Sequence, residues 1–117
     1  MFWNKEIKKK FGTFYIEEEE EGRIDIYDSK ERWLSKLEFE TDEERIGIVN
    51  FFDKVVSLKA LLAFIGIEYV AIIEGFEDAA NFAYEEGYLD ESEEPEALWD
   101  NEWVNVIGDS VIFVEEI

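Results

Sequence analysis

Phe11-Gly-Thr-Phe-Tyr-Ile-Glu17 and Arg23-Ile-Asp-Ile-Tyr27 establish the fold class of this 117-residue chain. The first stretch is rich in aromatic and β-branched residues, and the second alternates polar and apolar side chains, so its two isoleucines share one face. The segment Arg32 to Phe39 alternates in the same way. Turn sequences, Glu18 to Gly22 and Asp28-Ser-Lys-Glu31, separate the three segments. The pattern predicts an antiparallel three-stranded meander.

A helix is predicted directly after the meander. Thr41-Asp-Glu-Glu44 is a capping-box pattern, with Thr at the N-cap and Glu three residues later. Apolar residues then recur at helical spacing as far as Phe64, and Gly66 marks the end. We therefore expect one long helix over residues 41–64, buried on most of its sides, although Ile46 to Phe52 would also suit a strand.

The second half of the chain contains three more predicted elements. The apolar, β-branched stretch Ile67 to Ile73 indicates a buried strand. Phe76 to Glu86 indicates a short acidic helix that ends at Gly87, a C′ glycine. Trp103 to Val114, interrupted by Gly108-Asp109, closes the chain as a β-hairpin. The inner stripe of the acidic helix is Ala79, Ala80 and Ala83, and its outer stripe is Glu77, Asn81, Tyr84, Glu85 and Tyr88.

These elements predict an α+β fold in a single domain over residues 1–117. Its expected order is an N-terminal antiparallel meander, one long buried helix, a further strand, the short acidic helix and the C-terminal hairpin. Apolar residues make up 47% of the chain and aromatic residues 16%. That content excludes a disordered acidic chain, because disordered segments lack such aromatics.

Charge is distributed very unevenly along the sequence. The chain has 31 acidic and 11 basic residues, with a net charge of −20. The last base is Lys59, and no Lys, Arg or His follows it, although residues 60–117 carry 16 carboxylates. Ordinary surfaces intersperse both signs. This asymmetry predicts a basic partner, such as a nucleic-acid-binding protein or a cationic toxin.

Several functional classes are disfavoured by composition. The chain has no His and no Cys, so the commonest general base and the thiolate nucleophile are missing. Ser57, Ser92 and Ser110 lack the context of a nucleophile elbow, and no glycine-rich phosphate loop occurs. The acidic run Asp90 to Glu96 lacks the spacing and central glycine of a calcium-binding loop. We therefore expect no enzyme activity, no catalytic residue, no metal site and no cofactor.

The location of the protein is predicted from its apolar runs. The longest, Ala60 to Ile67, falls far short of the roughly 18 residues that span a bilayer. No apolar run follows the N-terminal lysines, so a signal peptide is not expected. The sequence favours a cytoplasmic protein. Because anionic membrane surfaces repel such an acidic chain, we expect no membrane binding. We also expect no direct binding to nucleic acid.

The predicted binding surface is the acidic helix with the loop after it, over residues 77–102. Helical residues three or four apart have Cβ atoms about 5–6 Å apart, an interval comparable with phosphates along a nucleic acid strand. The alternative is a solvated face that serves only solubility. Trp99 is either an aromatic anchor of this surface or a core residue. The candidate residues are Glu77, Asp78, Glu85, Glu86, Asp90, Glu91, Glu93, Glu94, Glu96, Trp99, Asp100 and Glu102.

Other conspicuous residues receive structural interpretations. The five glutamates Glu17 to Glu21 are expected at an exposed turn, where charge costs little. The lysine cluster Lys5 and Lys8 to Lys10 is expected to pair with acidic residues of the chain. Trp103 is expected in the core of the closing hairpin. Trp3, beside Phe2, either forms a further exposed patch or packs beneath the meander.

The last third of the chain resembles a known family. Ile72-Ile-Glu-Gly-Phe-Glu-Asp-Ala-Ala-Asn-Phe-Ala-Tyr-Glu-Glu-Gly-Tyr-Leu89, then Pro95-Glu-Ala-Leu-Trp-Asp100 and Gly108-Asp109, looks like the C-terminal part of the plasmid antirestriction DNA-mimic proteins. In that family a buried strand, an acidic helix ending in Glu-Glu-Gly and a Pro-led acidic segment follow one another. The resemblance implies a protein that mimics bent duplex DNA and occupies the DNA groove of restriction–modification enzymes.

The sequence therefore predicts a non-enzymatic acidic inhibitor that binds the basic nucleic-acid-binding surface of a target protein. An antirestriction-type DNA mimic is the leading version. An immunity protein that neutralises a basic nuclease-type toxin shares the same physics and differs in the partner. An acidic interaction or assembly domain without an inhibitory role is the third interpretation.

Overall fold

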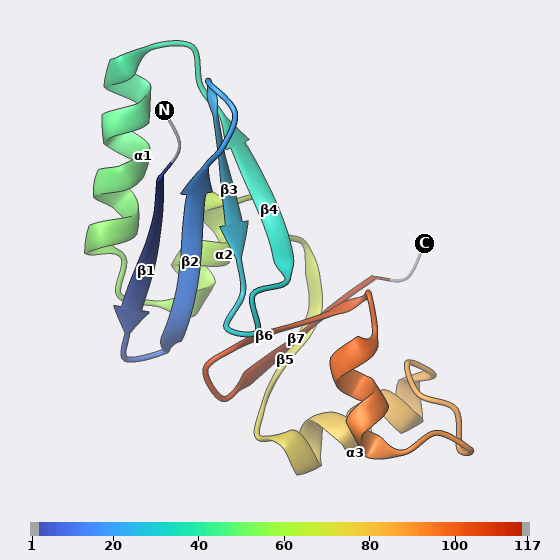
Figure 1. Ribbon diagram of the computed structural model, residues 1–117. Coiled ribbons are helices and arrows are strands. Elements are labelled where there is room, and N and C mark those ends of the chain that lie inside the picture. The colour runs from blue at the N-terminus through green and yellow to red at the C-terminus, as the bar shows by residue number, and fades with distance from the viewer. Residues whose placement is uncertain (1–2, 116–117) are drawn as a thin grey trace.

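The computed structural model describes residues 3–115 and has the predicted α+β composition (Figure 1). Its first sheet, here sheet 1, is an antiparallel meander in the order β1-β2-β3-β4. The strands are β1 (Trp3–Lys9), β2 (Gly12–Glu18), β3 (Arg23–Tyr27) and β4 (Trp33–Glu38).

Strand β1 adds a fourth member to the predicted three-stranded meander. It pairs with β2 along its whole length, from Trp3 opposite Glu18 to Lys9 opposite Gly12. Its composition gives little indication of a strand, because most of its residues are charged or polar. Ile7 is its one buried side chain. The charged residues around Ile7 suit an edge strand, where lysines discourage pairing with other chains.

Two helices, α1 (Asp42–Lys54) and α2 (Leu58–Phe64), replace the single long helix predicted over residues 41–64. The predicted cap is present, since the Glu44 N–H donates to Thr41 Oγ1 at 3.2 Å. The chain leaves the helix at Val55, which is extended, and Ser57 caps α2 by accepting from the Ala60 N–H. Ser57 therefore starts a second helix where the apolar spacing alone suggested continuity.

The burial predicted for the long helix holds only for its second half. Helix α2 buries Leu58, Leu61 and Leu62, whereas α1 buries only Phe52 and leaves Ile46 54% exposed. Both helices pack on one face of sheet 1 and form the first hydrophobic core with its inward-facing side chains. No helix in residues 3–115 is long and apolar enough to cross a membrane.

The second sheet, sheet 2, has the order β5-β7-β6 and is antiparallel. It contains β5 (Tyr69–Glu74) and the predicted hairpin of β6 (Val104–Ile107) and β7 (Ser110–Val114). The prediction that the first of these strands is buried is wrong, because β5 lies at the edge and leaves Tyr69 and Val70 39% and 55% exposed. The prediction that Trp103 lies in the core of the closing hairpin is also wrong, since Trp103 is half-buried and belongs to neither hydrophobic cluster.

Sheet 2 separates two hydrophobic cores. On β7, Ile112 faces the first core, while Val111 and Phe113 face a second core beneath helix α3 (Phe76–Glu86). Strand β7 is therefore buried on both faces, which explains why its sequence is continuously apolar instead of alternating. Figure 1 shows α3 and the 3₁₀ helix η1 (Pro95–Asp100) at the opposite end of the molecule from α1.

The turn between β3 and β4 joins the two halves of the molecule. Asp28 is fully buried, and its Oδ1 accepts from the N–H groups of Lys30 and Arg32, both at 3.0 Å. Its Oδ2 accepts from Asn105 Nδ2 at 3.0 Å and from the Val106 N–H at 3.1 Å, both on β6. One carboxylate thus closes the turn, as the sequence predicts, and also attaches sheet 2.

Glu18 departs from the exposed turn predicted for the glutamate run. It is the last residue of β2 and only 6% exposed, and its carboxylate accepts from Trp3 Nε1 and from Arg45 Nε on α1. Trp3 therefore packs within the fold, while Phe2 lies outside the described residues. Burial raises the pKa of Glu18, but the hydrogen bonds from Arg45 and Trp3 together hold that pKa below its ordinary value of 4.5.

This lowered pKa predicts how acid acts on the protein. Because folding favours the ionised carboxylate, the stability that Glu18 contributes is present above its unfolded pKa and is lost as pH falls through its lower folded value. The difference in unfolding free energy between wild type and Glu18→Gln should be constant from neutral pH down to about pH 5 and shrink below pH 4.5. Urea unfolding at several pH values measures it. A difference that does not change with pH would contradict the assignment.

Candidate interaction surface

The acidic segment, residues 77–102, begins on helix α3. The helix has its predicted bounds and ends at Gly87, whose φ of 85° is the left-handed conformation that favours glycine. Ala79, Ala80 and Ala83 are buried as predicted, and these small side chains let α3 lie close against sheet 2. The helix therefore presents its acidic residues outward.

The predicted outer stripe is correct for its acidic members and Asn81 but not for its tyrosines. Glu77, Asn81 and Glu85 are exposed, whereas Tyr84 and Tyr88 are half-buried against the second core. Tyr88 lies beyond the end of the helix, packs on Phe113 and donates its hydroxyl to the Val114 carbonyl at 2.7 Å. Aromatic rings at the border of an amphipathic helix fold inward because they contribute large apolar areas.

The segment after α3 returns antiparallel to the helix. The Tyr84 hydroxyl, near the end of α3, donates to the Glu93 carbonyl at 2.6 Å. The Phe76 ring, at the start of α3, lies 4.9 Å from the Trp99 ring, centroid to centroid. Helix η1, which lies in the predicted loop, buries Leu98 completely and so fixes this return. The acidic segment consequently forms two neighbouring stretches of chain, α3, which is acidic at its two ends, and residues 93–100.

Hydrogen bonds hold the returning segment in place. Asp90 and Glu93 close a turn, in which the Glu93 N–H donates to the Asp90 carbonyl at 2.9 Å and the Asp90 N–H donates to Glu93 Oε1 at 2.9 Å. Arg32 donates to the Trp99 and Asn101 carbonyls at 2.9 and 2.7 Å. The segment therefore has a defined shape in the protein by itself.

All the predicted carboxylates of the segment are exposed. No salt bridge in residues 3–115 involves a carboxylate after Asp53. Burial of Tyr84 and the nearby charges of Glu94, Glu93 and Glu96 raise the pKa of its phenol. The exposed carboxylates are Glu77, Asp78, Glu85, Glu86, Asp90, Glu91, Glu93, Glu94, Glu96, Asp100 and Glu102.

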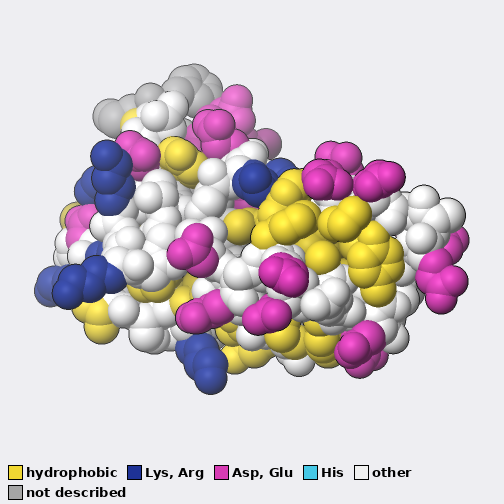
Figure 2. All heavy atoms as spheres, turned by 90° about the horizontal axis from the view of Figure 1, so that it is seen from below, with side chains coloured by type: hydrophobic (Ala, Val, Ile, Leu, Met, Phe, Trp, Pro, Cys, Tyr) yellow, Lys and Arg dark blue, Asp and Glu magenta, His cyan; other side chains and the backbone are white. Residues whose placement is uncertain are grey.

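An aromatic pair lies beside these charges. Phe76 is 36% exposed and packs on the half-buried Trp99, and Lys30 lies 4.6 Å from the centroid of the Trp99 ring. Figure 2 shows hydrophobic side chains gathered on one half of the visible face, with acidic side chains around their margin. Sequence reasoning missed Phe76 and Lys30, because only the fold brings the β3–β4 turn and the start of α3 to Trp99.

The prediction that the lysine cluster pairs with acidic residues is confirmed, within residues 3–115, for Lys5 and Lys8 only. Lys5 pairs with Asp53 of α1 at 2.9 Å, and Lys8 lies 4.0 Å from Glu6 on its own strand. Lys9 donates instead to the Asp53 backbone carbonyl. Lys5 and Lys9 therefore join β1 to α1.

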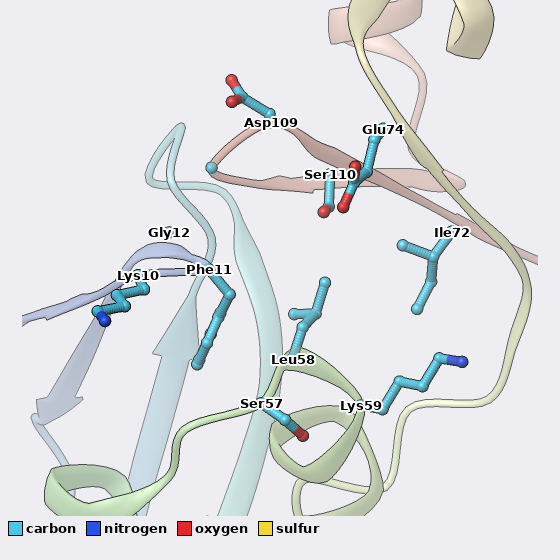
Figure 3. A pocket seen from close by; sticks show the side chains of 11 residues that line it. Lys10, Phe11, Gly12, Ser57, Leu58, Lys59, Ile72, Glu74, Asp109 and Ser110 are labelled. Carbon is cyan, nitrogen blue, oxygen red and sulfur yellow. The ribbon is translucent and has the colours of Figure 1, made fainter.

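A pocket of about 430 Å³ lies where the turn before β2, helix α2, β5 and the β6–β7 turn meet (Figure 3). Phe11, Leu58 and Ile72 border it, while the side chains of Lys10 and Asp109 point away from its centre. Its charged groups do not converge on one point. No three carboxylates in residues 3–115 are arranged to hold a metal ion. The acidic segment is therefore the better candidate site.

Comparison with known proteins adds no relative to this description. No protein-family model, curated protein or solved structure matches the chain.

Proposed function

We propose that this protein is a non-enzymatic acidic inhibitor that covers the basic nucleic-acid-binding surface of a target protein, with an antirestriction-type DNA mimic as the leading form. The observation that carries the proposal is the acidic segment itself. Its carboxylates are exposed, lie on a backbone that hydrogen bonds hold in place and have no salt bridge among the described residues. Such a surface complements a groove built for phosphates and steers rapid association with it.

The placement of charge on α3 favours a function over simple solubility. Glu85 and Glu86 occupy the last turn of the helix, which contains no basic residue. Carboxylates there face the negative end of the helix dipole, at a cost of about 0.3–1 kcal/mol each. Charge needed only for solubility could sit in the first turn, where it stabilises the helix.

The two neighbouring acidic stretches support the mimic in particular. A helix rises about 1.5 Å per residue, so the acidic pair Glu77–Asp78 and the pair Glu85–Glu86 lie about 12 Å apart along α3, with residues 93–100 beside them. Duplex DNA also carries its charge on two neighbouring strands. The resemblance of residues 72–109 to the antirestriction family points the same way.

An immunity protein is the second candidate, and the Phe76–Trp99 pair favours it. Aromatic anchors surrounded by charge are typical of protein–protein hot spots, and a phosphate mimic does not require them. A toxin gene directly upstream of this one would support the immunity role. A plasmid or phage context without such a gene would support the mimic.

Reversing four charges of the acidic segment tests the proposal. Glu85, Glu86, Glu91 and Glu94 are exposed, and none of them makes the side-chain hydrogen bond by which Glu93 closes its turn, so their change to Lys should leave the fold intact and weaken target binding by at least about 100-fold. The measurement is capture from a lysate on immobilised protein, with captured proteins identified by mass spectrometry and challenged with duplex DNA. Wild type should capture DNA-binding proteins, and added duplex DNA should then displace them.

A matched control carries the same number of reversals outside the segment. Glu21, Glu40, Glu68 and Glu115 are exposed and lie in other parts of the structure. Their change to Lys should reduce capture far less than the first variant does. Equal capture by wild type and the first variant would show that the acidic segment is not the binding surface.

A further inference from the structure

The outer face of sheet 1 carries a row of aromatic residues. Helices α1 and α2 cover the face that bears Phe14 and Ile16, so their strand neighbours point to the opposite side. Cross-strand register places Tyr15 opposite Tyr27, and Tyr27 opposite Trp33. No described helix covers this row, and Trp33 is 52% exposed.

Carboxylates accompany the aromatic row, and one of them has no basic partner among the described residues. Glu17 lies directly opposite Asp25 on the neighbouring strand. Asp25 is buried and satisfied, because Arg23 donates to it at 2.8 and 3.0 Å and Trp33 Nε1 at 2.9 Å. Glu17 has no salt bridge within residues 3–115. Like charges directly opposite each other destabilise a sheet, and here Arg23 offsets that repulsion by pairing with Asp25.

These groups surround a hollow of about 410 Å³. The residues that line it include three glutamates and two tyrosines but no Lys or Arg. Of these glutamates, only Glu6 has a basic partner within residues 3–115, Lys8 at 4.0 Å. Burial and the neighbouring Glu17 carboxylate raise the pKa of Tyr27 to about 12, so its phenol stays neutral beside the charge. Tyr27 also borders a second hollow of about 400 Å³ that extends to Trp33. The residues that line the first hollow are Asn4, Glu6, Tyr15, Ile16, Glu17, Tyr27 and Glu31.

We propose that this face of sheet 1 binds an extended, arginine-bearing segment of a basic partner protein, with one guanidinium group in the hollow between Tyr15 and Tyr27. A guanidinium group is planar, stacks on aromatic rings and donates to carboxylates in pairs, which matches both kinds of lining group. The hollow lies on an open sheet face, and the aromatic row continues to Trp33. An extended chain therefore fits it better than a small enclosed ligand does.

This site is separate from the acidic segment and does not depend on the function proposed for that segment. It lies on β1, β2 and β3 and the turn after β3, whereas the acidic segment packs on sheet 2. Two acidic surfaces on different sheets would let one protein hold a basic partner at two places.

The test is an NMR titration of the ¹⁵N-labelled full chain at low salt with a blocked peptide, acetyl-Gly-Arg-Gly-Arg-Gly-amide. The amide signals of Tyr15, Glu17 and Tyr27 should shift. The same peptide with citrulline in place of arginine, which is neutral and nearly isosteric, should leave them unmoved. Signals of residues 77–102 report separately on the acidic segment, and the charge-reversed variant of that segment should retain the shifts on sheet 1.

Paired variants decide whether the carboxylates bind the peptide. Glu17→Gln with Glu31→Gln should weaken binding at sheet 1 about fivefold, as expected for partly exposed charge pairs. Glu40→Gln with Glu43→Gln, which removes the same charge elsewhere, should have no effect. Tyr27→Leu should also weaken binding, and its spectrum shows whether the fold is retained. Shifts confined to residues 77–102, or equal shifts with the citrulline peptide, would overturn the proposal.

Discussion

Changing Asp28 to Asn is expected to destabilise the protein by about 2 kcal/mol, although it only replaces one oxygen with an NH₂ group. Each carboxylate oxygen of Asp28 accepts from two N–H donors. An amide must turn its NH₂ group toward one of these pairs, whichever way it is oriented. If the NH₂ group faces the turn, the N–H groups of Lys30 and Arg32 lose their acceptor. If it faces β6, the Asn105 amide can flip to accept from it, but the buried Val106 N–H loses its acceptor. Each unsatisfied buried group costs about 1–3 kcal/mol.

Urea unfolding, followed by far-ultraviolet circular dichroism, measures this loss. Asp109→Asn is the matched control, because Asp109 is an exposed carboxylate on the β6–β7 turn. It should change stability by less than about 0.5 kcal/mol. An Asp28→Asn variant that does not fold would agree with the expected loss of stability. A loss of unfolding free energy no larger than that of the control would show that Asp28 is not the junction between the sheets.

The same change bears on the acidic segment. Arg32, which holds the Trp99 and Asn101 carbonyls, belongs to the turn that Asp28 closes. A stability defect here should therefore loosen the interaction surface as well as the fold.

The second large effect is expected at Gly12. A Cβ atom there would lie 2.7 Å from Gly108 Cα and 2.8 Å from the Ile107 carbonyl carbon, because the turn before β2 meets the β6–β7 turn backbone to backbone. Gly12 also has a φ of 139°, which residues with a Cβ rarely adopt. Gly12→Ala should therefore destabilise the protein by about 3–5 kcal/mol, combining backbone strain with overpacking.

Gly66→Ala separates these two contributions. Gly66 has a φ of 76°, but no neighbouring atom lies within 4 Å of the position that a Cβ would take, so only the backbone strain applies. Its expected cost is about 1–2 kcal/mol in the same urea experiment. Equal losses for the two variants would mean that the close approach of Gly12 and Gly108 contributes nothing.

Local signals explain which elements could be predicted. Helix α3 was predicted with both ends correct, because its alanine stripe and Gly87 act within a few residues. The Thr41 cap was correct for the same reason. The break at Ser57 was missed because the apolar spacing continues through it, although serine is favoured at an N-cap over a helix interior.

Long-range contacts explain what could not be predicted. Strand β1 exists because β2 pairs with it, and Glu18 is buried because Arg45 and Trp3, far away in the sequence, converge on it. Within the candidate surface, the carboxylates and Trp99 could be identified from residue type and spacing. The contacts of Trp99 with Phe76 and Lys30 could not, because three separate segments supply them.

Residue composition and local periodicity were enough to establish the fold class, the acidic helix and the confinement of all basic residues to positions up to Lys59. None of these needs a tertiary contact. How the charge is used depends on the folded chain. Folding turns residues 93–100 back along α3, places Asp28 and Glu18 in the interior, and leaves Glu17 half-buried beside Tyr27 without a basic partner among the described residues. The physical reason is that a carboxylate is buried only where hydrogen-bond donors meet it, and Asp28 and Glu18 receive part or all of theirs from segments far away in the sequence.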